Sequence, residues 1–416
     1  MESRIEILVV DGDQNDGFAQ EFSYAKDGMQ TPQSYEFARH PAVEVTYTSD
    51  GLNPGRIAVH IIWSEYLGYG DDEQWEIIYR HLEFAADDQG EWITPPAVDE
   101  WQRVAIVPWS HETQPDLCVD YLTGDLYAAC KVETMENPPR WAIFAATLPA
   151  LWPEWLIVGP MTDLSDEHAM DFPSIDAGLF TETTPMGAGA QLNQVGVVWS
   201  QIIDHQPEHW YDVYYNGWPT GGIPSTANAM NISKITSEVP SAILPKIEVL
   251  PYSSGLHEAV ITWWEPSTGA GGIEYFPPVL MVATPYIGDA YSNPPFAVEG
   301  RSNRCPDLSP YQGMDEGPGK GVIALSRQCS ASFTEVWDIV VSAYIVEVYG
   351  NAFHFSEDEQ HALVPCAPQW VEANPFTGPS ICLRNPDPAG WGTDLFAMAW
   401  VEEGYFAYLA EGDTTE

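Results

Sequence analysis

The chain has 416 residues, of which 61 are acidic and 15 basic, giving a formal net charge of −46 at neutral pH. A surface this negative repels phosphate backbones and anionic lipid headgroups, which argues against nucleic-acid binding and against adhesion to anionic membranes. The chain also contains 17 Trp, 20 Tyr, 35 Pro and 33 Gly. Strand-forming aromatics mixed with turn-forming residues predict many short strands joined by loops rather than helices.

The first predicted element is the apolar run from Ile5 to Val10, which is typical of a strand. It is too short for the core of a signal peptide, and no later run is long enough to span a bilayer. We therefore expect no membrane insertion. If the protein is exported, its leader is absent from the given chain.

An acidic segment follows this strand. Carboxylates and an amide alternate at Asp11, Asp13, Asn15 and Asp16, which resembles the first half of a calcium-binding loop. Gly17 comes one residue late for such a loop. The four residues are candidate calcium ligands, and calcium is the only cofactor that the sequence suggests. The alternative is an acidic turn after a strand.

Six segments then repeat a proline followed two residues later by an apolar residue. They are Pro41-Ala-Val43, Pro115-Asp-Leu117, Pro173-Ser-Ile175, Pro245-Lys-Ile247, Pro306-Asp-Leu308 and Pro365-Cys-Ala367, at spacings of 74, 58, 72, 61 and 59 residues. Proline suits the start of a strand because its missing N–H is not needed there. Each segment therefore predicts the first strand of a repeating unit.

Each unit continues with a second apolar run and, in most units, a third run led by tryptophan. Second runs include 57–63, 126–130, 195–199, 259–263, 322–325 and 380–383, and the leading tryptophans are Trp75, Trp141, Trp210, Trp337 and Trp391. The continuous second runs predict strands buried on both faces. We expect the tryptophans to fill the wedges between neighbouring units.

Four short strands in a period of about 60 residues are typical of propeller blades. The sequence predicts an all-β fold, a six-bladed β-propeller with four-stranded antiparallel blades in a single domain spanning 1–416. The expected blades are 38–112, 113–170, 171–243, 244–303, 304–360 and 361–416 plus 1–12. The N-terminal strand would close the last blade, so that no sheet edge is left open at the chain ends.

The six cysteines form three local pairs: Cys118 with Cys130, Cys305 with Cys329 and Cys366 with Cys382. Each pair would join two strands of one unit, so we predict three disulfides, each stabilising the fold by about 3 kcal/mol. The alternative is six unrelated buried thiols. Because disulfides persist in oxidising compartments, the pairs predict an extracellular or cell-surface location.

The units resemble those of six-bladed sialidase-like propellers, whose blades open with a PDI-like strand and continue with a VVW run. Pro115-Asp-Leu117 and Val197-Val-Trp199 carry the resemblance, which covers nearly the whole chain. It implies the fold but not the activity. Neither the Asp-box turn of that family nor its arginine triad is found in this sequence.

No catalytic motif stands out among the many acidic residues. His205 and His209 have a spacing that could bind a metal on a helix, but their neighbours predict a loop. The first expectation is a non-enzymatic extracellular recognition or structural propeller with a protein or glycan partner, or a homo-oligomer or filament subunit of a surface assembly. The alternative is a glycan-active hydrolase or lyase with its site at the central channel mouth. A third reading is a cytoplasmic protein of a salt-accumulating cell.

Overall fold

The computed structural model describes a set of segments along the whole chain. They are residues 2–11, 18–24, 37–48, 56–69, 72–85, 95–104, 110–120, 122–134, 140–150, 152–162, 170–181, 191–203, 210–232, 243–250, 258–264, 281–283, 290–292, 303–310, 319–328, 337–349, 352–364, 371–373, 380–384 and 395–404. These residues form antiparallel strands almost throughout, which confirms the predicted all-β class. Within them, no helix has the length and apolar character needed to cross a bilayer.

The described strands assemble into six sheets, numbered here in chain order. Sheet 1 contains β3 (Ala38–Thr48), β4 (Arg56–Tyr69), β5 (Asp72–Ala85) and β6 (Val98–Val104). Sheet 2 contains β7 (Ser110–Asp120), β8 (Asp125–Thr134), β9 (Trp141–Leu148) and β10 (Leu156–Pro160). Sheet 3 contains β11 (Met170–Thr181), β12 (Gln191–Ile203), β13 (Trp210–Pro219) and β14 (Met230–Asn231), with the short helix η2 (Thr226–Asn228) between the last two.

The remaining three sheets complete the order. Sheet 4 contains β15 (Ile243–Leu250), β16 (Glu258–Trp264), β17 (Met281–Ala283) and β18 (Ala290–Ser292). Sheet 5 contains β19 (Asn303–Pro310), β20 (Gly319–Gln328), β21 (Trp337–Tyr349) and β22 (Ala352–Val364). Sheet 6 combines β23 (Val371–Ala373), β24 (Ser380–Arg384) and β25 (Leu395–Gly404) with β1 (Glu2–Asp11) and β2 (Phe18–Phe22).

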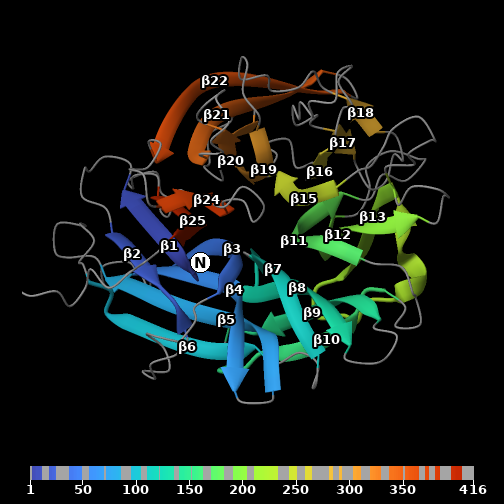
Figure 1. The fold of residues 1–416 in the computed structure, drawn as a ribbon. Helices are drawn as coiled ribbons and strands as arrows, with labels where there is room; N and C mark the ends of the chain where they lie inside the picture. Colours follow the sequence, from blue (N-terminus) through green and yellow to red (C-terminus); the bar gives the residue numbers. More distant parts are fainter. Residues whose placement is uncertain are drawn as a thin grey trace, which may run out of the picture.

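The first strand of each sheet lies toward the middle of the molecule (Figure 1). These strands contact one another in sequence, β3 with β7, β7 with β11, β11 with β15, β15 with β19 and β19 with β24, and β24 contacts β3 again. The arrangement is a propeller-like set of sheets around a common centre.

The two ends of the chain meet in sheet 6. β1 pairs with β25 over ten positions, from Glu2 opposite Gly404 to Asp11 opposite Leu395, and β2 pairs with β1. The predicted pairing of the N-terminal strand with the last sheet is therefore confirmed. The N-terminal contribution is a hairpin, since β2 supplies a further strand beyond the expected residues 1–12.

The repeated prolines mark a bulge in the first strand. His40, Gln114, Phe172 and Leu244 stand immediately before four of these prolines, and each has a positive φ of 54° or 55°. The strand register shifts across the same dipeptides, and it shifts again in β19 between Arg304 and Asp307, around Pro306. Two residues of the first strand therefore stand opposite one residue of the second strand, and this insertion of one residue bends the innermost strand at a fixed place.

The sixth repeat begins at a different proline from the expected Pro365. β24 starts at Ser380, directly after Pro379, and pairs with β25 as the first strands of the other sheets pair with their second strands. The run 380–383 is thus a first strand rather than a second one. Pro365 and Pro379 both fit the local pattern, and the pairing of β24 with β25 identifies Pro379 as the start of the sixth unit.

The core lies between neighbouring sheets. One apolar cluster joins sheets 6 and 1, a second joins sheets 1 and 2, and a third joins sheets 2 and 3. Ile61 belongs to the first cluster and its neighbour Ile62 to the second, and both are fully buried. The prediction that second-strand runs are buried on both faces is confirmed for β4.

The tryptophans that lead the third strands do not fill these wedges where their side chains are described. Trp75 and Trp141 are half-buried and lie outside the core clusters. Trp63 and Trp199 from the second strands are fully buried instead. The reason is position along the strand, because a residue near the start of β5 or β9 lies toward the end of the sheet rather than in its middle.

The predicted Cys118–Cys130 disulfide is absent, and both residues are buried thiols. Cys118 lies opposite Tyr127 and packs between sheets 2 and 3, whereas Cys130 packs between sheets 1 and 2. The two sulfurs point to opposite faces of the same sheet, so no bridge can form without changing the strand register. Cys329 and Cys366 lie outside the described residues, so the other two disulfides stay predictions.

Candidate functional site

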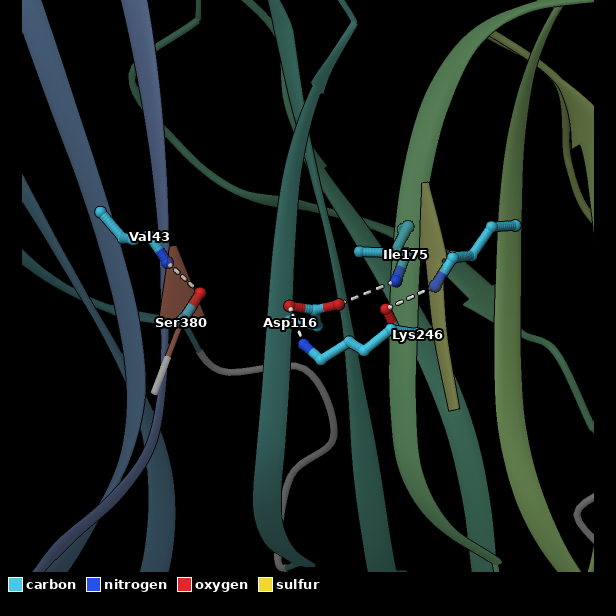
Figure 2. A network of polar contacts seen from close by, with 7 residues as sticks. Val43, Asp116, Ile175, Lys246 and Ser380 are labelled. Atoms are coloured by element: carbon cyan, nitrogen blue, oxygen red, sulfur yellow. Dashed lines mark hydrogen bonds and ion pairs between the residues drawn. The ribbon is translucent and has the colours of Figure 1, made fainter. Parts of the chain in front are cut away.

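The bulges bring the residue after each repeated proline against the next sheet. Oδ2 of Asp116 accepts a hydrogen bond from the backbone N–H of Ile175 at 3.0 Å (Figure 2). The hydroxyl oxygens of Ser174 and Ser380 accept from the equivalent N–H groups of Ile247 and Val43, at 3.3 Å and 3.1 Å. These side chains therefore provide hydrogen-bond acceptors for backbone N–H groups on the first strand of the next sheet.

The fourth unit has lysine at this position. Nζ of Lys246 lies 3.2 Å from Oδ1 of Asp116, so the ion pair reaches from sheet 4 to sheet 2 (Figure 2). The Lys246 side chain is 24% exposed and the Asp116 side chain 10%. A charged pair therefore lies among the innermost strands, mostly withdrawn from solvent.

A second ion pair lies at the same end of sheets 2 and 3. Nζ of Lys131 on β8 is 2.5 Å from Oδ1 of Asp171 on β11, and the hydroxyl of Tyr211 lies 3.4 Å from Oδ2 of Asp171. Burial and the neighbouring Asp171 carboxylate raise the pKa of Tyr211 to about 12. Tyr211 is therefore a neutral hydrogen-bond donor at physiological pH.

His40 lies near both ion pairs. Burial, and then the nearby positive charges of Arg39, Lys131 and Lys246, lower the pKa of His40 to about 3. Three of the 15 basic residues of the chain thus act on one imidazole. In a protein of net charge −46, this is a local concentration of positive charge next to two carboxylates.

Aromatic rings border the charged residues. The guanidinium of the exposed Arg39 lies 5.6 Å from the ring centroid of Trp75, whose ring is also 5.7 Å from that of Tyr66. Trp141 begins the third strand of sheet 2 and Trp75 is the fourth residue of the third strand of sheet 1, so both lie near the end where the bulges are. We call this end of sheets 1 to 4 the bulge-end site; its residues are Arg39, His40, Asp116, Lys131, Asp171, Tyr211 and Lys246.

Comparisons with known proteins give distant likenesses only. Among solved structures the chain is similar to a Hadza microbial sialidase, with a TM-score of 0.45 and 13% identity over 86% of this chain and 65% of the sialidase chain. It is also similar to a protein of unknown function from Dyadobacter fermentans, with a TM-score of 0.46 and 11% identity over 88% of this chain and 94% of that one. The chain thus spans less than two thirds of the sialidase. No protein-family model and no curated protein matches it.

The predicted calcium site falls largely outside the described residues. Asp11 ends β1 opposite Leu395, while Asp13, Asn15 and Asp16 lie in 12–17, which the structure does not describe. His205 and His209 lie outside as well. In the described part of the chain, no three His, Cys, Asp or Glu side chains are grouped so that they could hold a metal ion. Calcium binding therefore stays a prediction.

Sequence reasoning missed the bulge-end site although a signal for it exists. Asp116 and Lys246 directly follow repeated prolines, and Arg39 and Asp171 stand two residues before them. Charged residues at positions next to a buried strand start are uncommon unless they are paired. Comparing these positions across the six units would have singled out the site.

The arrangement offers hydrogen-bond donors and acceptors beside half-buried aromatic rings. The two carboxylates and two ammonium groups are held by one another, and the bulges hold the backbone beneath them. Such groups can exchange their internal contacts for those of a polar ligand without rearranging the fold.

Proposed function

We propose that this chain is a six-bladed β-propeller that works as a recognition module, binding a glycan at the bulge-end site without cleaving it. The six sheets are its blades. The observation that carries the proposal is the convergence of Lys131, Lys246, Arg39 and two carboxylates around the bulges of the innermost strands, in a chain poor in basic residues.

The contacts among the first strands support the propeller arrangement. They run in order from sheet 1 to sheet 6 and return to sheet 1. The β1–β25 pairing ties the two chain ends together in one sheet, as ring closure requires. In such a fold ligands commonly bind where loops and strand ends surround the axis, which is where the bulge-end site lies.

The chemistry of the site supports a glycan. Sugars combine vicinal hydroxyl groups, which pair with carboxylates and ammonium groups, with apolar ring faces, which pack on aromatic side chains. Asp116, Asp171 and Lys246 supply the first kind of partner, and Trp75 with Tyr66 supplies the second.

Recognition fits the site better than hydrolysis. A nucleophilic tyrosine needs a lowered pKa, and the Tyr211 pKa is raised to about 12. Asp116 and Asp171 are each held in an ion pair with lysine, whereas a general acid of a glycosidase requires a protonated carboxyl. The glycan-active hydrolase or lyase stays the second candidate, because two carboxylates do lie near the axis.

We further propose that the protein acts outside the cell or at its surface, in contact with a glycan or protein partner, as a monomer or as a subunit of a homo-oligomer or filament. The acidic surface suits an exposed, well-hydrated environment. The pairs Cys305 with Cys329 and Cys366 with Cys382, each with one member outside the described residues, would supply the disulfides expected there.

A glycan array followed by calorimetry tests the proposal. Asp116→Asn and Lys131→Gln are expected to weaken binding of a glycan hit by about tenfold or more, because each removes a charged hydrogen-bond partner. Glu154→Gln is the matched control, since Glu154 is exposed in the β9–β10 turn at the opposite end. Release of shorter sugars during the assay would favour the hydrolase, and an array without hits would refute glycan recognition.

A further inference from the structure

Exposed apolar side chains gather at the outer corner of sheet 2. Six large apolar side chains in the described part of the chain are exposed, and four of them lie here: Leu122 (62% exposed), Trp152 (57%), Leu156 (44%) and Ile157 (54%). We call these four residues the sheet 2 corner. Single exposed apolar residues are ordinary on protein surfaces, but a group of them marks a surface that another molecule covers.

The turns that carry the corner are fixed. The backbone N–H of Ala150 donates to Oδ1 of Asp125 at 2.9 Å, which joins the β9–β10 turn to the β7–β8 turn. The N–H of Trp152 donates to the carbonyl of Pro149 at 2.8 Å. Nε2 of Gln102 on β6 donates to the carbonyl of Pro153 at 3.1 Å, so sheet 1 supports the same turn. An exposed tryptophan on a rigid turn loses little entropy on binding, which suits it to anchor an interface.

The neighbouring strand edge carries no charge, although a bulge after Ile157 and Pro160 interrupt its far half. β10 has the sequence Leu-Ile-Val-Gly-Pro, without a charge, and in the described sheet it pairs with β9 alone. By contrast, the outer strand of sheet 1 carries Asp99, Glu100 and Arg103, and the outer strand of sheet 3 has two residues. Charges and short length are common means of preventing an edge from pairing with another chain. The β10 edge carries no charge of this kind.

The negative charge around the sheet 2 corner favours a positively charged partner. Glu154 is exposed between Trp152 and Leu156, Asp125 lies in the adjoining turn, and the chain carries a net charge of −46. A second copy would bring the same negative field to the interface and be repelled, whereas a basic partner would be attracted. We propose that the sheet 2 corner docks a basic segment of another protein that carries apolar side chains and lies extended along β10.

Fluorescence anisotropy with two labelled peptides of about ten residues tests this docking. One peptide alternates valine and lysine, and the other alternates serine and lysine, so the two have equal charge but differ in apolar content. The valine peptide is expected to bind at least about tenfold more tightly. Trp152→Ala and Ile157→Lys are expected to weaken its binding by about tenfold or more. Ile223→Ala is the matched control, because Ile223 is 82% exposed in the loop between β13 and η2 and is not one of the four corner residues.

Three results would overturn the proposal. Equal affinity for the two peptides would mean that charge alone attracts them. Binding that survives both Trp152→Ala and Ile157→Lys would place the peptide elsewhere. A dimer in sedimentation that Ile157→Lys dissociates would identify a second copy as the occupant. Since Trp152 and Ile157 are more than half exposed, neither variant is expected to disturb folding, and circular dichroism checks this.

Discussion

Nζ of Lys246 lies 3.2 Å from Oδ1 of Asp116, although Lys246 belongs to the first strand of sheet 4 and Asp116 to the first strand of sheet 2. The other oxygen of Asp116 accepts the N–H of Ile175 in sheet 3. One carboxylate therefore links three sheets that share no backbone ladder (Figure 2). The same side chain that we place in the bulge-end site also contributes to the packing of the sheets.

Removing this carboxylate should destabilise the fold. Asp116→Ala is expected to lower the free energy of unfolding by about 2–4 kcal/mol, because it leaves a largely buried ammonium and a backbone N–H without partners. Asp116→Asn keeps an acceptor for the Ile175 N–H and should lose roughly half as much. Urea denaturation measures both, with exposed Glu154→Gln as the control within about 0.5 kcal/mol. Equal losses in the two Asp116 variants would show that the Ile175 contact contributes nothing.

The serine contacts predict two effects of opposite sign. Ser174→Ala and Ser380→Ala should each cost about 1 kcal/mol, since each leaves a backbone N–H of the next sheet without its acceptor. Ala42 occupies the same position in sheet 1, but alanine has no side-chain oxygen to accept a hydrogen bond from the backbone N–H of Leu117. Ala42→Ser should therefore stabilise the protein by up to about 1 kcal/mol in the same assay. A loss of stability in Ala42→Ser would mean that the units are not equivalent at this position.

The sequence was sufficient for features that repeat or that depend on local pattern. Five of the six repeated prolines predicted first strands. The apolar run at 57–63 predicted burial on both faces, because a strand between two packed sheets cannot alternate in polarity. The strand-like start of the chain predicted the pairing of its ends, since an open sheet edge would otherwise remain.

Features that depend on register or on distant contacts could not be predicted. Cys118 and Cys130 lie on neighbouring strands, but whether they share a face depends on a pairing register that the X-Pro bulge shifts. Pro365 and Pro379 carry the same local signal, and the pairing of β24 with β25, together with the contact of Ser380 with Val43, singles out the second. The pairing of Asp116 with Lys246 joins residues 130 positions apart, and no local pattern encodes it.

Arg80 should prove important for holding the N-terminal hairpin. It makes a two-pronged ion pair with Asp99, donates to Gln20 on β2 at 2.8 Å, and lies 4.3 Å from the ring centroid of Phe22. Its side chain is 2% exposed. Arg80→Ala is expected to cost about 2–3 kcal/mol in chemical denaturation, because it removes a buried side chain that packs on the rings of Phe22 and Trp101 and pairs with Asp99. Hydrogen exchange of β1 and β2 amides should accelerate at the same time.

Arg56→Ala is the control for this variant. The Arg56–Glu83 ion pair also belongs to sheet 1, but the Arg56 side chain is 61% exposed. An exposed pair contributes little, so a loss below about 1 kcal/mol is expected. If Arg80→Ala were no more damaging than Arg56→Ala, the contacts between sheets 1 and 6 would have to come from the apolar cluster alone.

The thiols of Cys118 and Cys130 should resist oxidation in the folded protein. Both are buried, and burial raises the pKa of the Cys130 thiol well above its usual value, which keeps it in the unreactive form. Labelling with a thiol reagent under native conditions should leave both unmodified, and labelling after denaturation should modify both. A peptide map that shows Cys118 bridged to Cys130 would contradict the strand register.

Acid sensitivity should arise in part from His60, which is buried between sheets 1 and 2. Its Nε2 lies 2.9 Å from Oγ1 of Thr46, its Nδ1 lies 2.7 Å from the hydroxyl of Tyr79, and its ring stacks on that of His81 at 5.0 Å. Burial, and to a lesser degree the nearby His81, lower the pKa of His60 from 6.5 to about 3. The folded protein therefore keeps His60 neutral at pH values where the unfolded chain protonates it.

This difference fixes the direction of the pH dependence. Above pH 6.5 both states hold His60 neutral, so it adds no pH dependence. Between pH 6.5 and about 3 the unfolded chain binds a proton that the folded protein does not, so the free energy of unfolding falls by up to about 1.4 kcal/mol per pH unit. His60→Gln retains hydrogen-bonding capacity toward Thr46 and Tyr79 but cannot titrate. Urea denaturation at pH 7 and pH 4.5 should therefore show a smaller loss in His60→Gln than in the wild type, and an equal loss in both would exclude His60 as a source of acid sensitivity.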